Sequence, residues 1–357
     1  MKIGIPKEIK TLEARVGLIP AACSSLVHAG HQVYIEQAAG QLSGYKDEDY
    51  EKSGVNIVAD ADSLYDSAEM IVKVKEPIGP ELQRLKSHHL LFSYLHLAAE
   101  VPLMEKLLET GLTAVAFETV EEDKLLPLLA PMSDIAGRLS VQIGSNLLHR
   151  PQGGKGLLLG GLPGADRGHV VIIGGGVVGG NAAIVAASSG ARVTVFDFNR
   201  SKQEHLRTIG PNVTALYPFP ELVQKAVAEA DLLVGAVLVT GDKAPHVVTR
   251  EMVKSMSAGS VIVDVAVDQG GCVETTRPTT YADPTYVEEE ILHFCVTNMP
   301  GAVPRSASQA LSASLLPYVL KLGQSDWRTH IALSKGINVD GGKLVHPALQ
   351  HLFPDKV

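Results

Sequence analysis

The glycine-rich run VVIIGGGVVGGNAA at residues 170–183 constrains the fold most strongly, because it places clustered glycines directly after a buried strand pattern. Gly174, Gly176 and Gly179 fit the pattern G-x-G-x-x-G. The first glycine permits a tight turn, the second lets a pyrophosphate approach the backbone, and the third lets helix and strand pack closely. The following helix start offers N–H groups to phosphates. The run therefore predicts a strand, turn and helix that bind a dinucleotide.

Asp197 ends the next predicted strand, ARVTVFD, eighteen residues beyond Gly179. A carboxylate at this place hydrogen-bonds the ribose hydroxyls of adenosine and repels a 2′-phosphate, so it favours NAD over NADP. Arg200 lies nearby in the sequence and leaves the choice of cofactor open. A structural glycine turn beside a surface aspartate is the alternative interpretation of the same residues.

The composition excludes several classes of protein. With 357 residues, of which 45% are hydrophobic and 20% charged, the chain suits two packed globular domains. A net charge of −8 without a basic block argues against a nucleic-acid partner. The start lacks a signal peptide, and no stretch approaches the ~20 apolar residues that span a bilayer. Three scattered cysteines indicate a reducing cytoplasm and no metal site.

Strand and helix patterns alternate on both sides of the glycine turn, although almost half of the chain precedes it. Such alternation is typical of βαβ units and a mostly parallel sheet. The first half has strands expected at 2–6, 31–36, 70–75, 89–95 and 112–119, with helices at 20–30, 80–87 and 101–111. The second half has strands expected at 170–173, 192–197, 213–217, 231–237, 260–265 and 291–296. Long helices are expected at 131–150 and 306–323, and a hairpin at 336–345. The chain is predicted to be an α/β protein of two domains, each with a mostly parallel sheet flanked by helices.

Three polar residues of the first half lie where α/β sheets bind ligands, outside the carboxyl ends of strands. Arg15 lies in the loop ARVGLIP, Lys75 ends the run MIVKVK, and His96 follows the run HLLFSYL. A guanidinium pairs with a carboxylate, an ammonium polarises a carbonyl or imine, and an imidazole moves protons near neutral pH. Together they suit a small 2-oxo or 2-amino acid beside a nicotinamide.

Each of these residues also has a structural interpretation. Arg15 is also typical of a surface charge, and Lys75 of a solvated lysine at a strand end, although Lys73 already fits that description. A lone histidine between apolar residues, such as His96, is often a hydrogen-bonded residue of the core.

A second polar segment, VIVDVAVDQGG at 261–271, places Asp264 within a predicted strand and Asp268 just beyond it. A carboxylate at the end of a central strand can position water or ammonia and stabilise a cationic imine. A turn-capping role is the alternative for Asp268. The proline-bounded loop VTNMPGAVP at 296–304 is expected to line the nicotinamide.

In order along the chain, these stretches and others resemble the alanine dehydrogenase family, NAD-dependent enzymes that interconvert L-alanine with pyruvate and ammonium. The resemblance covers essentially the whole chain and is carried by MKIGIPKEIK, ARVGLIP, VKVKEP, YLHLAA, LLAPMSDIAGRLS, IIGGGVVG, GAVLVTG, VDVAVDQGGCVET and NMPGAVP. It implies a homohexamer whose chains have two domains around a cleft. A Rossmann-type NAD-binding domain (129–304) would be inserted into a discontinuous substrate domain (1–128 with 305–357).

The resemblance also implies roles for single residues. Arg15 and Lys75 match the family's substrate-binding pair, and His96 and Asp268 match its catalytic residues. Further residues match its cofactor contacts: Ser133, Val177, Val178, Asp197, Lys202, Val237, Leu238, Val265, Ala266, Val267, Arg277, Val296, Thr297, Asn298 and Met299.

Two stretches depart from the family pattern. Pro218 stands where the family usually has serine, which affects one expected adenosine-side contact. The run SASQALSAS at 306–314 has serine where threonine and asparagine are usual, and Arg305 before it is unusual. These changes are expected to affect packing or domain closure more than chemistry.

Other functions remain open. An NAD(H)-binding subunit of a proton-translocating transhydrogenase would hand hydride to another subunit without a small-acid site, and the set of Arg15, Lys75 and His96 argues against it. A non-catalytic NAD-binding module would have no use for that set. The same chemistry on another 2-oxo acid, such as glyoxylate or oxobutyrate, stays open because the sequence does not give the volume of the substrate site.

Overall fold

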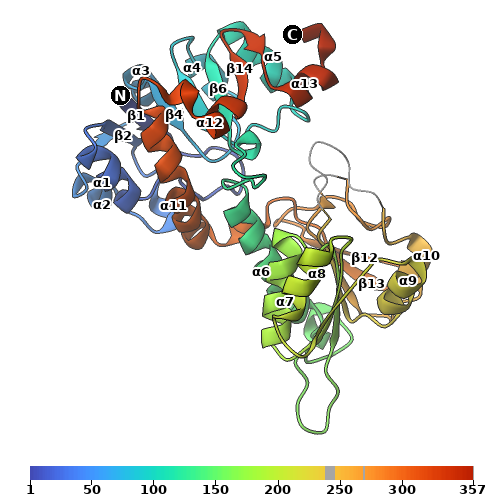
Figure 1. The fold of residues 1–357 in the computed structure, drawn as a ribbon. Helices are drawn as coiled ribbons and strands as arrows, with labels where there is room; N and C mark the ends of the chain where they lie inside the picture. The colour runs from blue at the N-terminus through green and yellow to red at the C-terminus, as the bar shows by residue number, and fades with distance from the viewer. Residues whose placement is uncertain (238–245, 268–269, 357) are drawn as a thin grey trace. The chain divides into compact units, whose positions relative to one another are not determined.

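The computed structural model describes residues 1–237, 246–267 and 270–356, and the chain folds into two compact units (Figure 1). Unit 1 consists of Met1–Met132 together with Gly301–Val357. Unit 2 is formed by the intervening residues, Ser133–Pro300. The middle of the chain therefore interrupts unit 1, and each unit has a sheet of its own.

Unit 1 is built on an eight-stranded sheet in the order β15-β14-β6-β5-β4-β1-β2-β3. Strands β1 to β6 are parallel to their neighbours, whereas β14 and β15 are added antiparallel at one edge. The strands are β1 (Lys2–Ile5), β2 (Gln32–Glu36), β3 (Asn56–Val58), β4 (Met70–Val72), β5 (Leu90–Ser93), β6 (Thr113–Ala116), β14 (Ile337–Asp340) and β15 (Lys343–Leu344). The helices are α1 (Pro20–His28), α2 (Asp47–Glu51), α3 (Ala61–Ser67), α4 (Glu81–Arg84), α5 (Val101–Thr110), α11 (Pro304–Leu322), α12 (Ile331–Lys335) and α13 (Pro347–Leu352).

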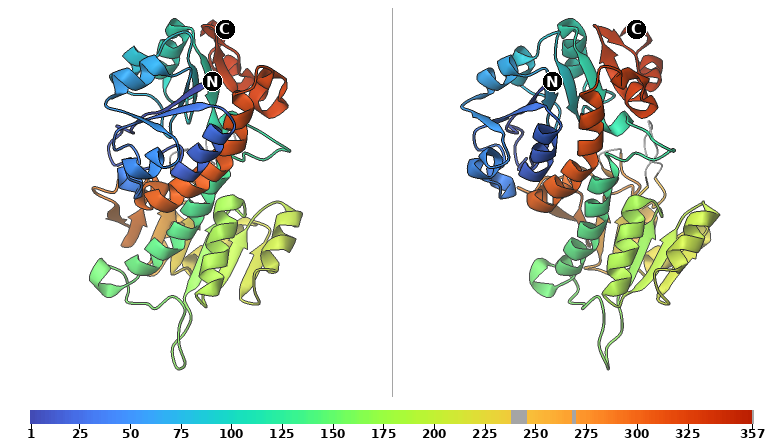
Figure 2. Two further views of the ribbon diagram at one scale, coloured as in Figure 1. Left: turned by 90° about the vertical axis from the view of Figure 1, so that its left-hand side faces the viewer. Right: turned by 60° about the vertical axis from the view of Figure 1, so that its left-hand side comes forward.

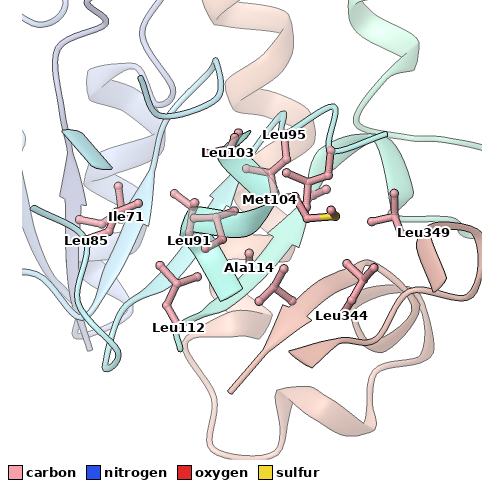
Figure 3. Packing of buried hydrophobic residues seen from close by; sticks show 14 of the residues in the cluster. Ile71, Leu85, Leu91, Leu95, Leu103, Met104, Leu112, Ala114, Leu344 and Leu349 are labelled. Atoms are coloured by element: carbon pink, nitrogen blue, oxygen red, sulfur yellow. The ribbon is translucent and has the colours of Figure 1, made fainter. Parts of the chain in front are cut away.

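The core of unit 1 lies against the sheet and unites both segments of the chain. Figure 3 shows Ile71, Leu91 and Ala114 of the central strands packed with residues of α5 and with Leu344 and Leu349 from the C-terminal segment. Since apolar burial is worth roughly 25 cal/mol per Å², this shared cluster ties the end of the chain to the first six strands. The long helix α11 packs against α1, and Figures 1 and 2 show the two helices side by side.

Unit 2 is built on a seven-stranded sheet in the order β12-β13-β11-β10-β7-β8-β9, in which only β12 is antiparallel to its neighbour. The strands are β7 (His169–Ile173), β8 (Arg192–Phe196), β9 (Val213–Leu216), β10 (Leu232–Gly235), β11 (Val261–Asp264), β12 (Thr285–Glu288) and β13 (Ile291–Phe294). The helices are α6 (Ala130–Leu147), whose first three residues belong to unit 1, α7 (Val177–Ser188), α8 (Arg200–Arg207), α9 (Pro220–Ala228) and α10 (Arg250–Lys254).

Both faces of this sheet are covered by helices. Val171 and Ile173 of β7 pack in a cluster with residues of α9 and α10, whereas Ile172 between them lies against α7 at Gly179. A strand that is buried on both faces has no polar side to present, so β7 reads as a continuous apolar run. The prediction of an α/β protein with two mostly parallel sheets is confirmed.

The elements differ from the expected ones in several places. The strand expected at 70–75 ends at Val72, although two backbone hydrogen bonds to the β5 segment continue past it, from the N–H of Lys73 to Phe92 and from the N–H of Tyr94 to Val74. Several short elements were not anticipated from the sequence, among them α2, α3, the three-residue strand β3 and the antiparallel edge strand β12. Elements of this length show too few residues for a periodic pattern. The expected hairpin is formed by β14 and β15, with Gly341 and Gly342 at positive φ in its turn.

Of the helices that the structure describes, none is both long and apolar enough to span a bilayer.

Candidate active site

In each sheet the strand order reverses beside the first strand. The chain builds outward from that strand to one edge of the sheet and then returns to build outward on its other side. In unit 1 this reversal lies between β1 and β4, and in unit 2 between β7 and β10. Ligands of open α/β sheets bind at the carboxyl ends of the strands beside such a reversal. In unit 1, Arg15 lies in the loop that leaves β1, and Lys75 in the segment that leaves β4.

Arg15 is buried and is held by a carboxylate of its own loop. Its Nε and Nη2 donate to the two oxygens of Glu13 at 2.6 and 2.5 Å, and its backbone N–H also donates to Glu13 at 3.1 Å. Nη1 lies 3.0 Å from the sulfur of Met132. Since Glu13 already engages the Nε and Nη2 edge, a substrate carboxylate has to be bound through other donors of Arg15 or through another cation.

Two serines of α11 fix the backbone next to Arg15. Ser308 accepts from the N–H of Val16 at 3.0 Å, and Ser312 accepts from the N–H of Ile19 at 2.9 Å. Ser312 also donates to the carbonyl oxygen of Gly17 at 3.2 Å. These serines belong to the run that departs from the family pattern, and they connect the C-terminal segment directly to the loop that carries Arg15.

Lys75 is mostly buried close to Arg15. Burial lowers its pKa most strongly, and the positive charge of Arg15 lowers it further, while Glu76 opposes this shift. Burial and a neighbouring cation both disfavour the ammonium form, so a bound anion would relieve the cost of keeping Lys75 charged.

The description of Lys73 as the solvated lysine of this strand end is wrong. Its side chain is 1% exposed and its Nζ lies 3.3 Å from Glu8 and 3.0 Å from Glu81. A charge so completely buried is found in proteins only when it is paired, which explains the two carboxylates. Lys75 is therefore the more accessible of the two lysines.

His96 follows β5, the strand next to β4, and its side chain is 43% exposed. It is thus no core histidine. Its φ of 51° lies in the left-handed region, a strained conformation for a residue with a Cβ. Glu118 stabilises this turn by accepting from the N–H groups of Leu95 and His96 at 3.1 and 2.6 Å. The ring of His96 is parallel to that of Tyr94, with 5.9 Å between the centroids.

Glu118 and Tyr94 are site residues that the sequence reasoning missed. Tyr94 donates to the carbonyl oxygen of Leu128 at 2.6 Å, and burial raises its pKa while the nearby charge of Arg15 opposes the rise. Tyr94 therefore lies beside the ring of His96 and within the electrostatic influence of Arg15. Glu118 comes shortly after β6, so the strand-end rule that singled out the other residues could have found it.

In unit 2, two glycines of the motif have a steric reason within the protein, and the third leaves open space. Gly174 has a φ of +101°, and a Cβ there would lie 2.5 Å from the carbonyl oxygen of Ala236. A Cβ on Gly179 would lie 1.8 Å from the carbonyl oxygen of Gly174, so only glycine lets α7 start this close to the turn. Gly176 precedes α7, and a Cβ there would have no heavy-atom neighbour within 4 Å. The described residues thus leave space on the side of Gly176 where a phosphate would bind.

Asp197 follows β8 and is hydrogen-bonded to the glycine turn. Its carboxylate accepts from the N–H of Gly175 at 2.8 Å and from the N–H of Asn199 at 2.8 Å. The ammonium of Lys202 lies 3.6 Å away, whereas Arg200 is exposed and pairs with Glu204. A single carboxylate thus connects the phosphate turn with the place expected for the adenosine ribose.

The other predicted cofactor residues of unit 2 lie mostly at carboxyl strand ends. Val177 and Val178 begin α7, Val237 follows β10, Val265, Ala266 and Val267 follow β11, and Val296, Thr297, Asn298 and Met299 follow β13. Ser133 lies on α6 one turn before Gly137, whose Cα faces the backbone of Val178. Arg277 is exposed and stacks its guanidinium on the ring of Tyr286. Leu238 and Asp268 lie outside the described residues.

An exposed aromatic cluster beside Asp197 was not anticipated from the sequence. Phe198 and Tyr217 have ring centroids 5.3 Å apart, and Tyr217 and Phe219 4.8 Å apart. Phe198 is 71% and Phe219 57% exposed. The cluster flanks Pro218, at the carboxyl ends of β8 and β9. Exposed aromatic faces beside a site for ribose are suited to stacking against a purine base.

Comparisons with known proteins cover almost the whole chain. The family models "Alanine dehydrogenase/PNT, N-terminal domain" and "Alanine dehydrogenase/PNT, C-terminal domain" match residues 4–136 and 140–347. The chain is 47% identical to the alanine dehydrogenase of Halomonas elongata over 99% of this chain and 97% of that protein. It is 49% identical to the alanine dehydrogenase of Methanococcus maripaludis over 98% of this chain and 95% of that protein.

Two solved structures extend the comparison. A structure described as an L-alanine dehydrogenase superposes with a TM-score of 0.97 at 53% identity, covering 100% of both chains. A transhydrogenase structure from Sinorhizobium meliloti gives a TM-score of 0.84 at 24% identity, covering 98% of this chain and 100% of that one. The second likeness shows the shared fold alone.

Proposed function

Because the chain belongs to the alanine dehydrogenase/PNT family, we propose that it catalyses the reversible oxidative deamination of L-alanine to pyruvate and ammonium with NAD. The observation that carries this proposal is that one chain has both a dinucleotide-type turn in unit 2 and Arg15 and Lys75 at the strand reversal of unit 1. A subunit that only exchanged hydride between nucleotides would have no need of a buried arginine, a partly buried lysine and a histidine there. The transhydrogenase relative is also the more distant one.

The residues of unit 2 fit a dinucleotide. The turn at Gly174–Gly176 and the start of α7 would hold the pyrophosphate, and Asp197 would bind the ribose hydroxyls and disfavour a 2′-phosphate. Phe198 and Tyr217 would pack against the adenine. NAD, when bound, supplies the acceptor for the hydride that leaves Cα of alanine.

The residues of unit 1 would bind the amino acid and move protons. Lys75 and Arg15 would hold the substrate carboxylate or the forming carbonyl oxygen, with Glu13 keeping the guanidinium in place. His96 would remove a proton from the water that adds to the imine and return one to the departing ammonia. By the family resemblance, Asp268 would stabilise positive charge on the imine and position the water. Such chemistry needs reacting atoms within about 3–3.5 Å of each other.

We also propose that the chain assembles as a homohexamer and works in the cytoplasm. The family resemblance supports the hexamer. The cytoplasmic location is supported by three buried cysteines that form no disulfide.

The test is NADH oxidation by the purified protein with pyruvate and ammonium, followed by loss of NADH absorbance. Glyoxylate and oxobutyrate in place of pyruvate define the substrate side chain, and NADPH in place of NADH tests the cofactor. Pyruvate is expected to be the best substrate, with no oxidation when ammonium is omitted. Hydride exchange between two nucleotides without any use of pyruvate would contradict the proposal and favour the transhydrogenase alternative.

A further inference from the structure

We propose that Glu8 is a positioning residue for Lys75, and this inference rests on the proposed function of Lys75 in binding the substrate. Glu8 lies in the loop after β1, almost entirely buried, and contacts the segment that follows β4. Nothing in the sequence pattern relates it to Lys75, because 67 positions separate the two residues.

The carboxylate of Glu8 binds the backbone at Lys75 and not its side chain. One oxygen accepts from the N–H of Val74 at 2.6 Å, and the other from the N–H of Lys75 at 3.4 Å. The same carboxylate lies 3.3 Å from the ammonium of Lys73. Backbone hydrogen bonds to the β5 segment accompany these contacts as far as Val74, whose carbonyl oxygen accepts from the N–H of Tyr94 at 3.2 Å, and the Glu8 carboxylate adds a partner for the N–H groups of Val74 and Lys75.

Glu81 is the second carboxylate at Lys73. It lies 3.0 Å from the ammonium of Lys73 and accepts from the N–H of Ile78 at 2.9 Å. Both carboxylates therefore neutralise the same buried lysine, but only Glu8 touches the backbone of Lys75. Loss of either one leaves a buried charge less well compensated, so both should matter for stability.

This difference gives a matched pair of variants, Glu8→Gln and Glu81→Gln. Both should lower Tm, because each removes one negative charge from Lys73. Only Glu8→Gln should raise the KM for pyruvate, by about tenfold, the size expected for the loss of a hydrogen bond to a charged group. The KM for NADH should stay within about twofold of the wild-type value in both variants.

Glu8→Asp provides a second variant in case Glu8→Gln does not fold. It keeps the negative charge for Lys73 but withdraws the oxygens by one methylene from the two N–H groups. The KM for pyruvate should again be higher than in wild type. In addition, the pH above which this KM increases should differ from that of wild type and of Glu81→Gln. A purely structural role would move neither quantity.

The outcomes separate this inference from the proposed function. If the wild-type protein uses pyruvate and Lys75→Ala cripples that use, the function stands. An unchanged pyruvate KM in Glu8→Gln and Glu8→Asp, or an equal rise in Glu81→Gln, would then overturn the positioning role alone. Absence of any pyruvate-dependent turnover in the wild type would overturn both.

Discussion

The two units share one strand order and use the connection after their first strand in opposite ways. Their order is β3-β2-β1-β4-β5-β6 in unit 1 and β9-β8-β7-β10-β11-β13 in unit 2. In unit 2, only Gly174–Gly176 separate β7 from α7, and the helix start is brought to the ligand. In unit 1, residues 6–19 separate β1 from α1, and this loop fills the corresponding place with its own charged side chains. The same topology thus presents backbone N–H groups at this place in one unit and side-chain cations in the other, two kinds of group that suit an anion.

A second contrast concerns the carboxylates that hold each site together. Asp264 at the end of β11 accepts from the N–H groups of Ala266 and Cys272 at 3.0 and 3.1 Å and from the hydroxyl of Thr276 at 2.8 Å. Burial raises its pKa, and these hydrogen bonds oppose the rise. Glu8 in unit 1 also accepts backbone N–H groups, but it is paired in addition with the ammonium of Lys73. Unit 1 therefore contains a denser set of buried charges.

The largest expected effect is a loss of turnover without a loss of cofactor binding, caused by a substitution in unit 1. His96→Ala should reduce kcat by about 10²- to 10⁴-fold, because it removes the proton-transferring group. The Kd for NADH, measured by fluorescence titration, should not change, because His96 follows a strand of unit 1. Near-normal turnover in this variant would show that the histidine is not the acid–base group.

The next largest effect should impair cofactor binding in unit 2 and leave the side chains of unit 1 unchanged. Gly179→Ala would place a Cβ 1.8 Å from the carbonyl oxygen of Gly174, so the turn has to open. We expect the Kd for NADH to rise by at least about tenfold, the equivalent of ~1.4 kcal/mol. Gly180→Ala is the matched control, because a Cβ at Gly180 meets no heavy atom within 4 Å. Equal losses of NADH affinity in both variants would mean that close packing at Gly179 is not what shapes the turn.

A smaller effect tests which cofactor unit 2 selects. Asp197→Ser keeps a polar side chain but removes the charge that would repel a 2′-phosphate. The ratio of kcat/KM for NADH over NADPH should fall by about tenfold, with Lys202 and Arg200 then available to a phosphate. The ratio is the informative readout, since the lost bond to the N–H of Gly175 should weaken both cofactors alike. A ratio equal to that of the wild type would remove Asp197 from cofactor selection.

The smallest effect is a pH dependence that only unit 1 should show. Burial and the charge of Arg15 lower the pKa of Lys75 below its ordinary value of 10.5, with Lys10 adding to the shift and Glu76 and Glu13 opposing it. Lys75 carries its charge below this lowered pKa and loses it as the pH rises through it. The KM for pyruvate should therefore rise by a few fold at high pH, whereas the KM for NADH should not follow. Lys75→Arg, which stays charged, should flatten the rise; a rise that persists in this variant would point to another group.

The candidate site residues could be predicted from the sequence because their signals are local. Glycines follow an apolar run at Gly174, and the polar residues Lys75, His96 and Asp197 come shortly after strands, so their positions follow from periodicity and turn residues alone. Lys73 shows the limit of this reasoning. It stands two positions from Lys75 in the same apolar run, and its burial depends on Glu8 and Glu81, which no local pattern connects to it.

The sequence by itself determined the α/β class, the dinucleotide turn and the set of polar residues at the strand ends, because each depends on a few neighbouring positions. The tertiary structure alone decided which carboxylate holds which cation, and that Val16 and Ser308, 292 positions apart, are hydrogen-bonded. Such contacts arise only when parallel strands come together and bring distant loops to one edge of the sheet. Their strength then comes from burial, since a charge or N–H group removed from water must find its partner within the protein.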